Sequence, residues 1–333
     1  MATPSGRDSH EMNQRTIAWL LEHDNPCAEY LTRTRLLGES SQSKHATIAR
    51  ELIPGSPPIR KILDRQLSDG SWDDGGGWYL PKYKSSIWQL IILSQTGIDP
   101  KRPEIRRMCD NAFRFQNPEH GFSSGTVEDW SSDWARLSGC LNGNVIAALC
   151  RLGYGGDARV RKAVNRLTEL QEPDGGWGCR SFGYHRYDKH SCFMGTVCAL
   201  GSLVEYSKQR KVRRIADSTD KACEFILMHN LFRADHHNWK VVDPGYTKLS
   251  APYLVGYNIL RALELLAMAG VKDDRMDEAL SLVRDKRKPS GRWARETRWP
   301  SNTYSSFGEI STDDKWVTMH AMITLRMLNS LKS

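Results

Sequence analysis

One phrase recurs along the chain and limits the possible folds more than any other feature. A glutamine or a basic residue, a turn and a glycine precede an aromatic residue, most clearly in the segment Gln171-Glu-Pro-Asp-Gly-Gly-Trp177. A period of 50 to 62 residues is too long for one helical hairpin of a short solenoid, but it accommodates two helices and a loop. The sequence therefore predicts a repeat architecture. The aromatic residues of the successive copies are Trp72, Phe122, Trp177, Trp239 and Trp293.

Two kinds of helix alternate between these aromatic residues. The first kind is apolar on most sides and is therefore expected to be enclosed by other helices. The second kind is amphipathic, with apolar positions such as Val160 and Val164. We expect apolar helices at 86–95, 142–152, 192–206, 252–269 and 315–328. We expect amphipathic helices at 57–66, 103–116, 158–171, 213–229 and 274–286.

This alternation predicts an all-α toroid, in which an inner ring of helices lies inside an outer ring. Strand signals are almost absent from the sequence. The repeats account for five helix pairs, and helices within residues 9–52 are available for a sixth. We therefore expect an α/α toroid of five or six pairs over residues 56–333, preceded by an N-terminal helical segment and connector over residues 1–55. The polar rim where the inner helices begin is the expected functional end.

Composition limits the class of protein. Hydrophobic residues make up 39% and charged residues 26% of the 333 residues, which is typical of a globular protein and excludes disorder. No apolar run approaches the ~20 residues of a membrane span, and the N-terminus resembles no signal peptide, so we expect a cytoplasmic location. The eight cysteines are then buried fillers, metal ligands or reactive thiols. The net charge of +8 favours an anionic partner, but no nucleic-acid-binding module accompanies it.

The repeated phrase resembles that of squalene–hopene cyclases and protein prenyltransferase β subunits. The resemblance covers most of residues 56–328 and implies an α/α toroid around a central cavity. In that family the glutamine, the Asp-Gly pair and the tryptophan tie helix ends together, so their counterparts in 171–177 are expected to be structural. The Asp-x-Asp-Asp acid motif of the class II cyclases is missing from this sequence. Asp313 and Asp314 are candidate catalytic acids, and the alternative is that they cap the last inner helix.

The resemblance to prenyltransferase β subunits is closer between Gly175 and Cys192. It implies that Cys192 is a zinc ligand and that His190 takes the place of a liganding aspartate. It also implies that three basic residues hold a diphosphate, namely Arg180, Arg186 and Lys189. Tyr257 and Asn258 stand where the family has a third ligand, a histidine, which departs from the pattern. A β subunit of that kind also needs a partner subunit.

Zinc chemistry can also be considered from the residues alone. Zinc prefers about four thiolate and imidazole ligands in a tetrahedron. Because neighbouring inner helices begin at the same rim of a toroid, Cys140 and Cys192 are candidates for one site together with Cys179 and His190. The alternative is a set of unrelated thiols. His185 and Asp188, in the same loop, are candidates for proton transfer.

Aromatic residues are expected at the mouth or wall of the cavity. An aromatic lining suits an isoprenoid chain or a carbocation, whose charge is stabilised by ring faces. The alternative is that these residues only fill the core. The candidates for substrate binding are Trp88, Tyr253, Tyr257 and Trp316.

Three functions remain open from the sequence. The first is an isoprenoid enzyme of the terpenoid cyclase or prenyltransferase kind, with or without the assistance of zinc. The second is another zinc-dependent toroid enzyme, of the lanthionine cyclase kind. The third is a subunit without catalytic activity that binds a lipid or a partner.

Overall fold

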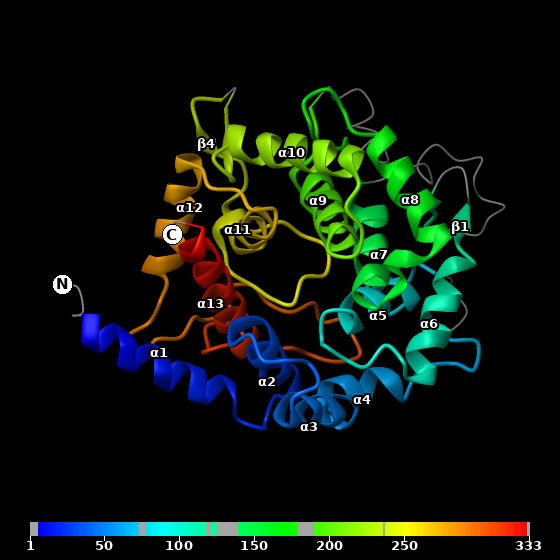
Figure 1. Cartoon of the computed structure of the whole chain (residues 1–333), viewed down its shortest axis with the longest axis horizontal. Helices are drawn as coiled ribbons and strands as arrows, with labels where there is room; N and C mark the ends of the chain where they lie inside the picture. Colours follow the sequence, from blue (N-terminus) through cyan, green and yellow to red (C-terminus); the bar gives the residue numbers. More distant parts are fainter. Residues whose placement is uncertain are drawn as a thin grey trace.

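The computed structural model shows a closed ring of helices around a central space (Figure 1). The inner helices are α2 (Pro26–Leu31), α5 (Ser86–Leu93), α7 (Gly139–Arg151), α9 (Phe193–Ser207), α11 (Ile259–Met268) and α13 (Lys315–Ser330). The outer helices are α1 (Gly6–Leu20), α3 (Lys44–Leu52), α4 (Pro57–Leu63), α6 (Pro103–Phe113), α8 (Ala158–Glu169), α10 (Arg213–Met228) and α12 (Asp277–Asp285). The predicted toroid is therefore confirmed. The structure describes residues 6–72, 78–117, 121–124, 139–178, 190–235 and 237–331, with side chains from residue 11 onward.

Short elements join the helices. A π-helix, η1 (Thr32–Leu36), continues α2. The 3-10 turns are η2 (Ile53–Gly55), η4 (Tyr154–Gly156), η6 (Pro244–Thr247) and η7 (Asp274–Met276). Two antiparallel hairpins pair β1 (Gln116–Asn117) with β2 (Gly121–Phe122) and β3 (Arg233–Ala234) with β4 (Lys240–Val241). These strands are two residues long, so the chain is helical in class.

The repeated tryptophan fastens the end of an outer helix to the start of the next inner helix. The Trp177 indole N–H donates to the Leu167 carbonyl at 2.8 Å, and its backbone N–H donates to the Thr196 hydroxyl at 3.1 Å. Trp72 and Trp293 make the same two hydrogen bonds. Their indoles donate to carbonyls that also lie ten residues earlier, and their backbone N–H groups donate to a Ser or Thr hydroxyl in α5 and α13. All three tryptophans are at most 2% exposed. The expected structural role is confirmed.

The repeated glutamine joins successive outer helices. Gln171 donates to the carbonyls of Gly175 at 2.7 Å and Ser218 at 2.8 Å, which links its turn to α10. Gln66 bonds its own turn and the Glu104 carbonyl of α6 in the same way. These side chains therefore tie each turn to the outer helix of the next repeat.

The inner helices pack closely at α7 and α9. A Cβ atom at Gly143 would lie 2.3 Å from the backbone carbon of Cys198, so only glycine permits this approach. At the same end, a Cβ atom at Gly139 would lie 3.1 Å from the Gly195 carbonyl oxygen. The first turns of α7 and α9 therefore touch, as expected for neighbouring helices that begin at one rim.

The N-terminal residues belong to the ring. The Thr16 hydroxyl of α1 donates to the Gly291 carbonyl at 3.3 Å, and Arg287 donates to Asn13 at 2.7 Å, so the N-terminal helix meets the last repeat. Apolar residues on both sides of residue 55 form one continuous core. The division of the chain at residue 55 stays a prediction.

One predicted helix is shorter than expected. The helix expected at 252–269 begins at Ile259, because Asn258 caps it by accepting the Arg261 backbone N–H at 3.0 Å. The residues before Asn258 instead run through the middle of the ring, where they appear in yellow in Figure 1. This segment brings backbone and side chains into the centre of the toroid.

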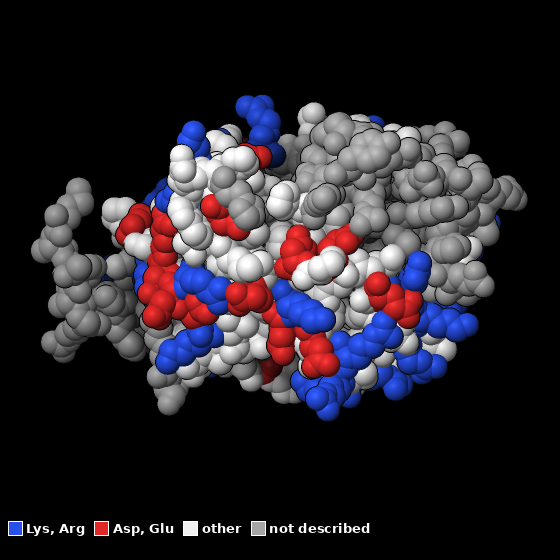
Figure 2. Space-filling model, turned by 90° about the horizontal axis from the view of Figure 1, so that it is seen from above, with Lys and Arg blue, Asp and Glu red and all other residues white. Residues whose placement is uncertain are grey.

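The outer surface carries mixed charge. Figure 2 shows Lys and Arg side chains interspersed with Asp and Glu on one face, with basic side chains gathered at its lower right. Surface pairs such as Arg275–Glu224, at 2.7 Å, join neighbouring elements. Within the described residues, no helix combines the length and apolar character that a membrane span requires.

Candidate functional site

A cavity of about 360 Å³ lies at the centre of the ring. Its wall includes Gln95 and Lys208, which follow α5 and α9, and Arg151 and Met268, which end α7 and α11. The cavity therefore lies toward the carboxyl ends of the inner helices, away from the rim where functional residues were expected. Its volume suits a small molecule.

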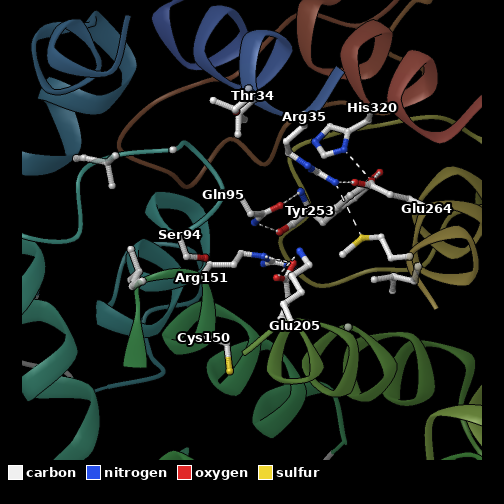
Figure 3. Close-up of a pocket in the computed structure, with 18 of the residues that line it drawn as sticks. Thr34, Arg35, Ser94, Gln95, Cys150, Arg151, Glu205, Tyr253, Glu264 and His320 are labelled. Carbon is white, nitrogen blue, oxygen red and sulfur yellow. Dashed lines mark hydrogen bonds and ion pairs between the residues drawn. The ribbon is translucent and has the colours of Figure 1, made fainter. Parts of the chain in front are cut away.

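Glu264 is the centre of a buried polar cluster in this wall (Figure 3). One carboxylate oxygen accepts a bond from Arg35 of η1 at 2.7 Å. The other accepts from His320 Nδ1 of α13 at 2.7 Å and from the Tyr253 hydroxyl at 3.3 Å. Segments far apart in the sequence thus converge on one carboxylate that is 6% exposed.

The partners of Glu264 keep it ionised. Burial alone would raise the pKa of Glu264, but His320 and Arg35 outweigh burial, and the pKa lies below its ordinary value of 4.5. Burial, and next the charge of Glu264, raise the pKa of the Tyr253 hydroxyl well above 10.0. Tyr253 therefore remains a hydrogen-bond donor to a carboxylate at neutral pH.

His320 has one occupied and one unoccupied ring nitrogen. An ionised carboxylate only accepts, so the Nδ1 atom facing Glu264 carries a proton. Nε2 is buried and has no hydrogen-bond partner among the described residues. The His320 ring contacts those of Tyr253 and Trp316, at centroid distances of 5.1 and 6.5 Å. A buried polar atom without a partner costs about 1–3 kcal/mol, so this nitrogen requires an explanation.

A second carboxylate, Glu205 of α9, lies across the cavity. It accepts bonds from Arg151 at 3.0 Å and Lys208 at 2.7 Å. Burial alone would raise the pKa of Glu205, but Arg151 and Lys208 lower it below 4.5. A glycosidase of the usual two-carboxylate kind needs one carboxylic acid with a raised pKa. Neither carboxyl group in the described wall meets that requirement.

Gln95 holds Tyr253 in place. Its side-chain amide donates to the Tyr253 carbonyl at 2.6 Å, and its oxygen accepts the Tyr253 backbone N–H at 2.8 Å. The donor and the acceptor of the Gln95 amide thus both bond to the backbone of Tyr253. The segment that crosses the ring is fixed where it contributes to the cavity.

The cluster could have been found from polar residues within apolar helices. Arg261 and Glu264 interrupt the run Ile259-Leu-Arg-Ala-Leu-Glu-Leu-Leu266, and their spacing of three places them on one helix face. A charge on such a helix is costly unless it is paired or functional. Arg35 carried no comparable signal, because its position depends on the π-helix η1, a distortion common at functional sites.

The four aromatic residues expected at the cavity have different positions. Tyr253 lines the cavity, and Trp316 packs against His320 behind the wall. Trp88 is buried and donates its indole N–H to the Tyr79 carbonyl at 2.9 Å. Tyr257 donates its hydroxyl to the Leu231 carbonyl, and its ring lies tilted against that of Tyr246, 4.7 Å between centroids. Trp88 and Tyr257 thus have partners outside this cavity.

The two candidate acids at the start of α13 both have basic partners. Asp314 caps α13 by accepting the Val317 N–H at 2.9 Å and forms a buried ion pair with Arg295 at 2.8 Å. The capping role considered from the sequence is confirmed for Asp314. Asp313 bonds to Lys288 at 2.8 Å, and its pKa is lowered because Lys288 outweighs the effect of burial.

Two of the predicted zinc ligands, Cys140 and Cys192, lie at the opposite rim from the cavity. Cys140 is in the first turn of α7 and Cys192 precedes α9, and the Cys192 N–H donates to the Trp177 carbonyl at 2.9 Å. Among the residues that the structure describes, no group of three His, Cys, Asp or Glu side chains is arranged to hold a metal. The zinc site stays a prediction. Several predicted site residues lie outside the described residues, namely Cys179, Arg180, His185, Arg186, Asp188 and Lys189.

The fold is similar to that of solved enzymes at low sequence identity. A polysaccharide lyase superposes with a TM-score of 0.53 at 12% identity, over 99% of both chains. The GH76A α-1,6-mannanase from Salegentibacter sp. HEL1_6 gives a TM-score of 0.50 at 11% identity, over 98% of this chain and 99% of the mannanase. These two likenesses establish the α/α toroid fold and leave the substrate open.

The type II terpene cyclase MstE from Scytonema gives a TM-score of 0.49 at 13% identity, over 99% of both chains. No protein-family model matches this chain, and no curated protein matches it.

Proposed function

We propose that this chain is an enzyme that transfers a proton to or from a small molecule in the central cavity, with His320 Nε2 as the acceptor. The observation that carries the proposal is the Glu264–His320 pair. Glu264 binds one nitrogen of a buried imidazole and leaves the other without a partner beside a cavity. An imidazole oriented by a carboxylate is a common arrangement for general base catalysis.

Each residue of the cluster has a defined part in this step. A substrate C–H group placed at Nε2 transfers its proton to the ring, the bonding electron pair stays on the substrate carbon, and Nδ1–H remains bonded to Glu264. In D₂O the proton on Nε2 exchanges for a deuteron, which returns to the same carbon. The ionised Glu264 stabilises the imidazolium that forms. Arg35 keeps Glu264 ionised and oriented. General base catalysis of this kind contributes about 10²–10⁴-fold in rate.

The lining of the cavity bears on the substrate. The described wall includes five basic side chains, namely Arg35, Arg50, Arg151, Lys208 and Arg261. This charge supports a polar substrate more than an all-hydrocarbon one. The isoprenoid substrate expected from the sequence remains a proposal with weaker support.

A zinc-dependent enzyme is the second candidate. Zinc would be held by Cys140, Cys179, His190 and Cys192 and would supply a Lewis acid or a bound thiolate. The contact between the first turns of α7 and α9 supports this proposal, because it brings two of these thiols to one rim. Elemental analysis should find about one zinc per chain, and Cys140→Ser and Cys192→Ser should each lose it. A folded parent protein without metal would remove this candidate.

Proton transfer can be tested before the substrate is known. The parent protein is incubated with a small-metabolite extract in D₂O, and mass spectrometry then identifies compounds that gain deuterium. We expect at least one compound to be labelled by the parent and by His45→Gln, an exposed control in α3. His320→Gln should label it at least about 100-fold more slowly.

Equal labelling by His320→Gln would contradict the assignment of the base. Absence of any labelled compound with folded parent protein would favour a binding subunit without catalytic activity.

A further inference from the structure

We infer that the cavity binds an anionic group of its ligand on Arg261, so that the ligand carries a carboxylate or a phosphate. This inference deepens the proposed function and rests on its cavity. Arg261 lines the cavity from α11, one turn before Glu264, and it is 6% exposed. Its position is inside the ring, where an unpaired charge is costly.

Arg261 is held only by uncharged groups. It donates to the Asn144 side-chain oxygen at 2.9 Å and to the Gly256 carbonyl at 3.0 Å. Its guanidinium lies over the Tyr253 ring, 5.4 Å from the centroid. These contacts orient the planar group without neutralising it, and they leave further N–H donors of the guanidinium for a ligand.

The acids of the cavity wall are already occupied by other cations. Glu264 binds Arg35, His320 and Tyr253, and Glu205 binds Arg151 and Lys208. In the described part of the chain, no carboxylate forms an ion pair with Arg261. The described residues therefore leave the buried guanidinium without a counter-charge, and in this inference the ligand supplies it.

The side chains that contact Arg261 carry no negative charge. Cys198 lies close to Arg261 and Asn144, but burial raises the pKa of its thiol, which stays neutral. Because a guanidinium only donates, the Asn144 oxygen must face it, and the Asn144 amide nitrogen is left without a partner among the described residues. An unneutralised cation and an unused donor thus lie side by side in the core.

Arg50 adds to the positive character of the same cavity. It donates to the Gly97 carbonyl at 3.1 Å and lies over the Tyr30 ring, and the described residues offer it no carboxylate partner. A planar guanidinium matches the paired oxygens of a carboxylate or phosphate. The cavity volume limits the ligand to a small molecule.

Equilibrium binding of simple anions tests this inference. Inorganic phosphate and succinate are each titrated into the full-length protein by calorimetry at constant ionic strength. We expect saturable binding of at least one anion, and a Kd at least about tenfold higher for Arg261→Gln. Arg15→Gln, at a position 83% exposed on α1, should bind like the parent. Preference for phosphate would indicate a phosphate ester, and preference for succinate a carboxylate.

Two results would overturn the inference: no binding of either anion to the parent, or equal affinity in Arg261→Gln. If Arg261→Gln does not fold, Arg261→Lys replaces it, because lysine keeps the charge but not the planar donors. Its Kd should rise at least about threefold, and an unchanged Kd would contradict the inference.

The two proposals fail separately. His320→Gln should still bind the anion, because His320 does not contact Arg261 in the proposed site. Anion binding without deuterium transfer would leave this inference intact and remove the proposed reaction. Deuterium transfer in a protein that binds neither anion would leave the proposed reaction intact and remove this inference.

Discussion

Replacing Glu264 tests whether the buried cluster has the charges described above. Removing one partner of a buried ion pair costs about 3–5 kcal/mol. Arg35 is 31% exposed and regains some water, so we expect Glu264→Ala to lower the free energy of unfolding by about 3 kcal/mol. Glu264→Gln keeps the shape and one acceptor oxygen, and we expect a loss of about 1–2 kcal/mol. Glu11→Gln, an exposed control, should change stability by less than about 0.5 kcal/mol.

Urea denaturation at several pH values measures these differences. Burial alone would raise the pKa of Glu264, but His320 and Arg35 bring it below 4.5. As the pH falls, Glu264 is therefore protonated in the unfolded chain before it is protonated in the folded protein. The stabilisation from Glu264 is therefore complete at pH 7 and decreases as the pH falls below about 4.5. The difference between the parent and Glu264→Gln should shrink over that range. A loss below about 0.5 kcal/mol for Glu264→Ala at pH 7 would refute this reasoning.

Three further predictions concern single residues. Trp177→Phe removes the indole hydrogen bond to Leu167 and should lower the free energy of unfolding by about 1 kcal/mol. Trp239→Phe, at a site 47% exposed, should not lower it. Equal effects of the two substitutions in urea titration would contradict the structural role of the repeated tryptophan. Burial raises the pKa of the Cys150 thiol to about 12, so iodoacetamide at pH 8 should label it only after unfolding, as mass spectrometry can show. Asp314→Asn leaves buried Arg295 unpaired and should lower the free energy of unfolding by about 3 kcal/mol. Asp313→Asn should lower it by less than about 1 kcal/mol, because its partner Lys288 is more exposed. The reverse order in urea titration would contradict these ion pairs.

Much of the fold could be predicted because its signals are local. The spacing of Trp72, Trp177 and Trp293 follows from bonds that each tryptophan makes within its own repeat. Helix starts such as Lys315 follow from the cap that precedes them. The segment before Ile259 was wrongly predicted as helix, because its apolar composition reflects burial in the middle of the ring and not helical periodicity.

The cavity could not be predicted in the same way. Arg35, Glu264 and His320 come from segments that meet only when the ring closes, and no local pattern relates them. The motif resemblance between Gly175 and Cys192 predicted a site at the opposite rim instead. The sequence did carry one signal for the cavity, namely the charged residues Arg261 and Glu264 within the apolar run of α11. Both lie in the cavity wall.

The position of the proton on the neutral His320 ring decides whether Nε2 can act as the base. Nitrogen-15 NMR distinguishes the two neutral forms of an imidazole, because protonated and unprotonated ring nitrogens have well-separated chemical shifts. In the pH range where the ring is neutral, we predict a proton on Nδ1 and an unprotonated Nε2. In Glu264→Gln the amide can donate to Nδ1, so the proton should become free to move to Nε2. A neutral ring protonated at Nε2 in the parent protein would contradict the proposed role of His320, because that nitrogen would have no lone pair to accept a proton.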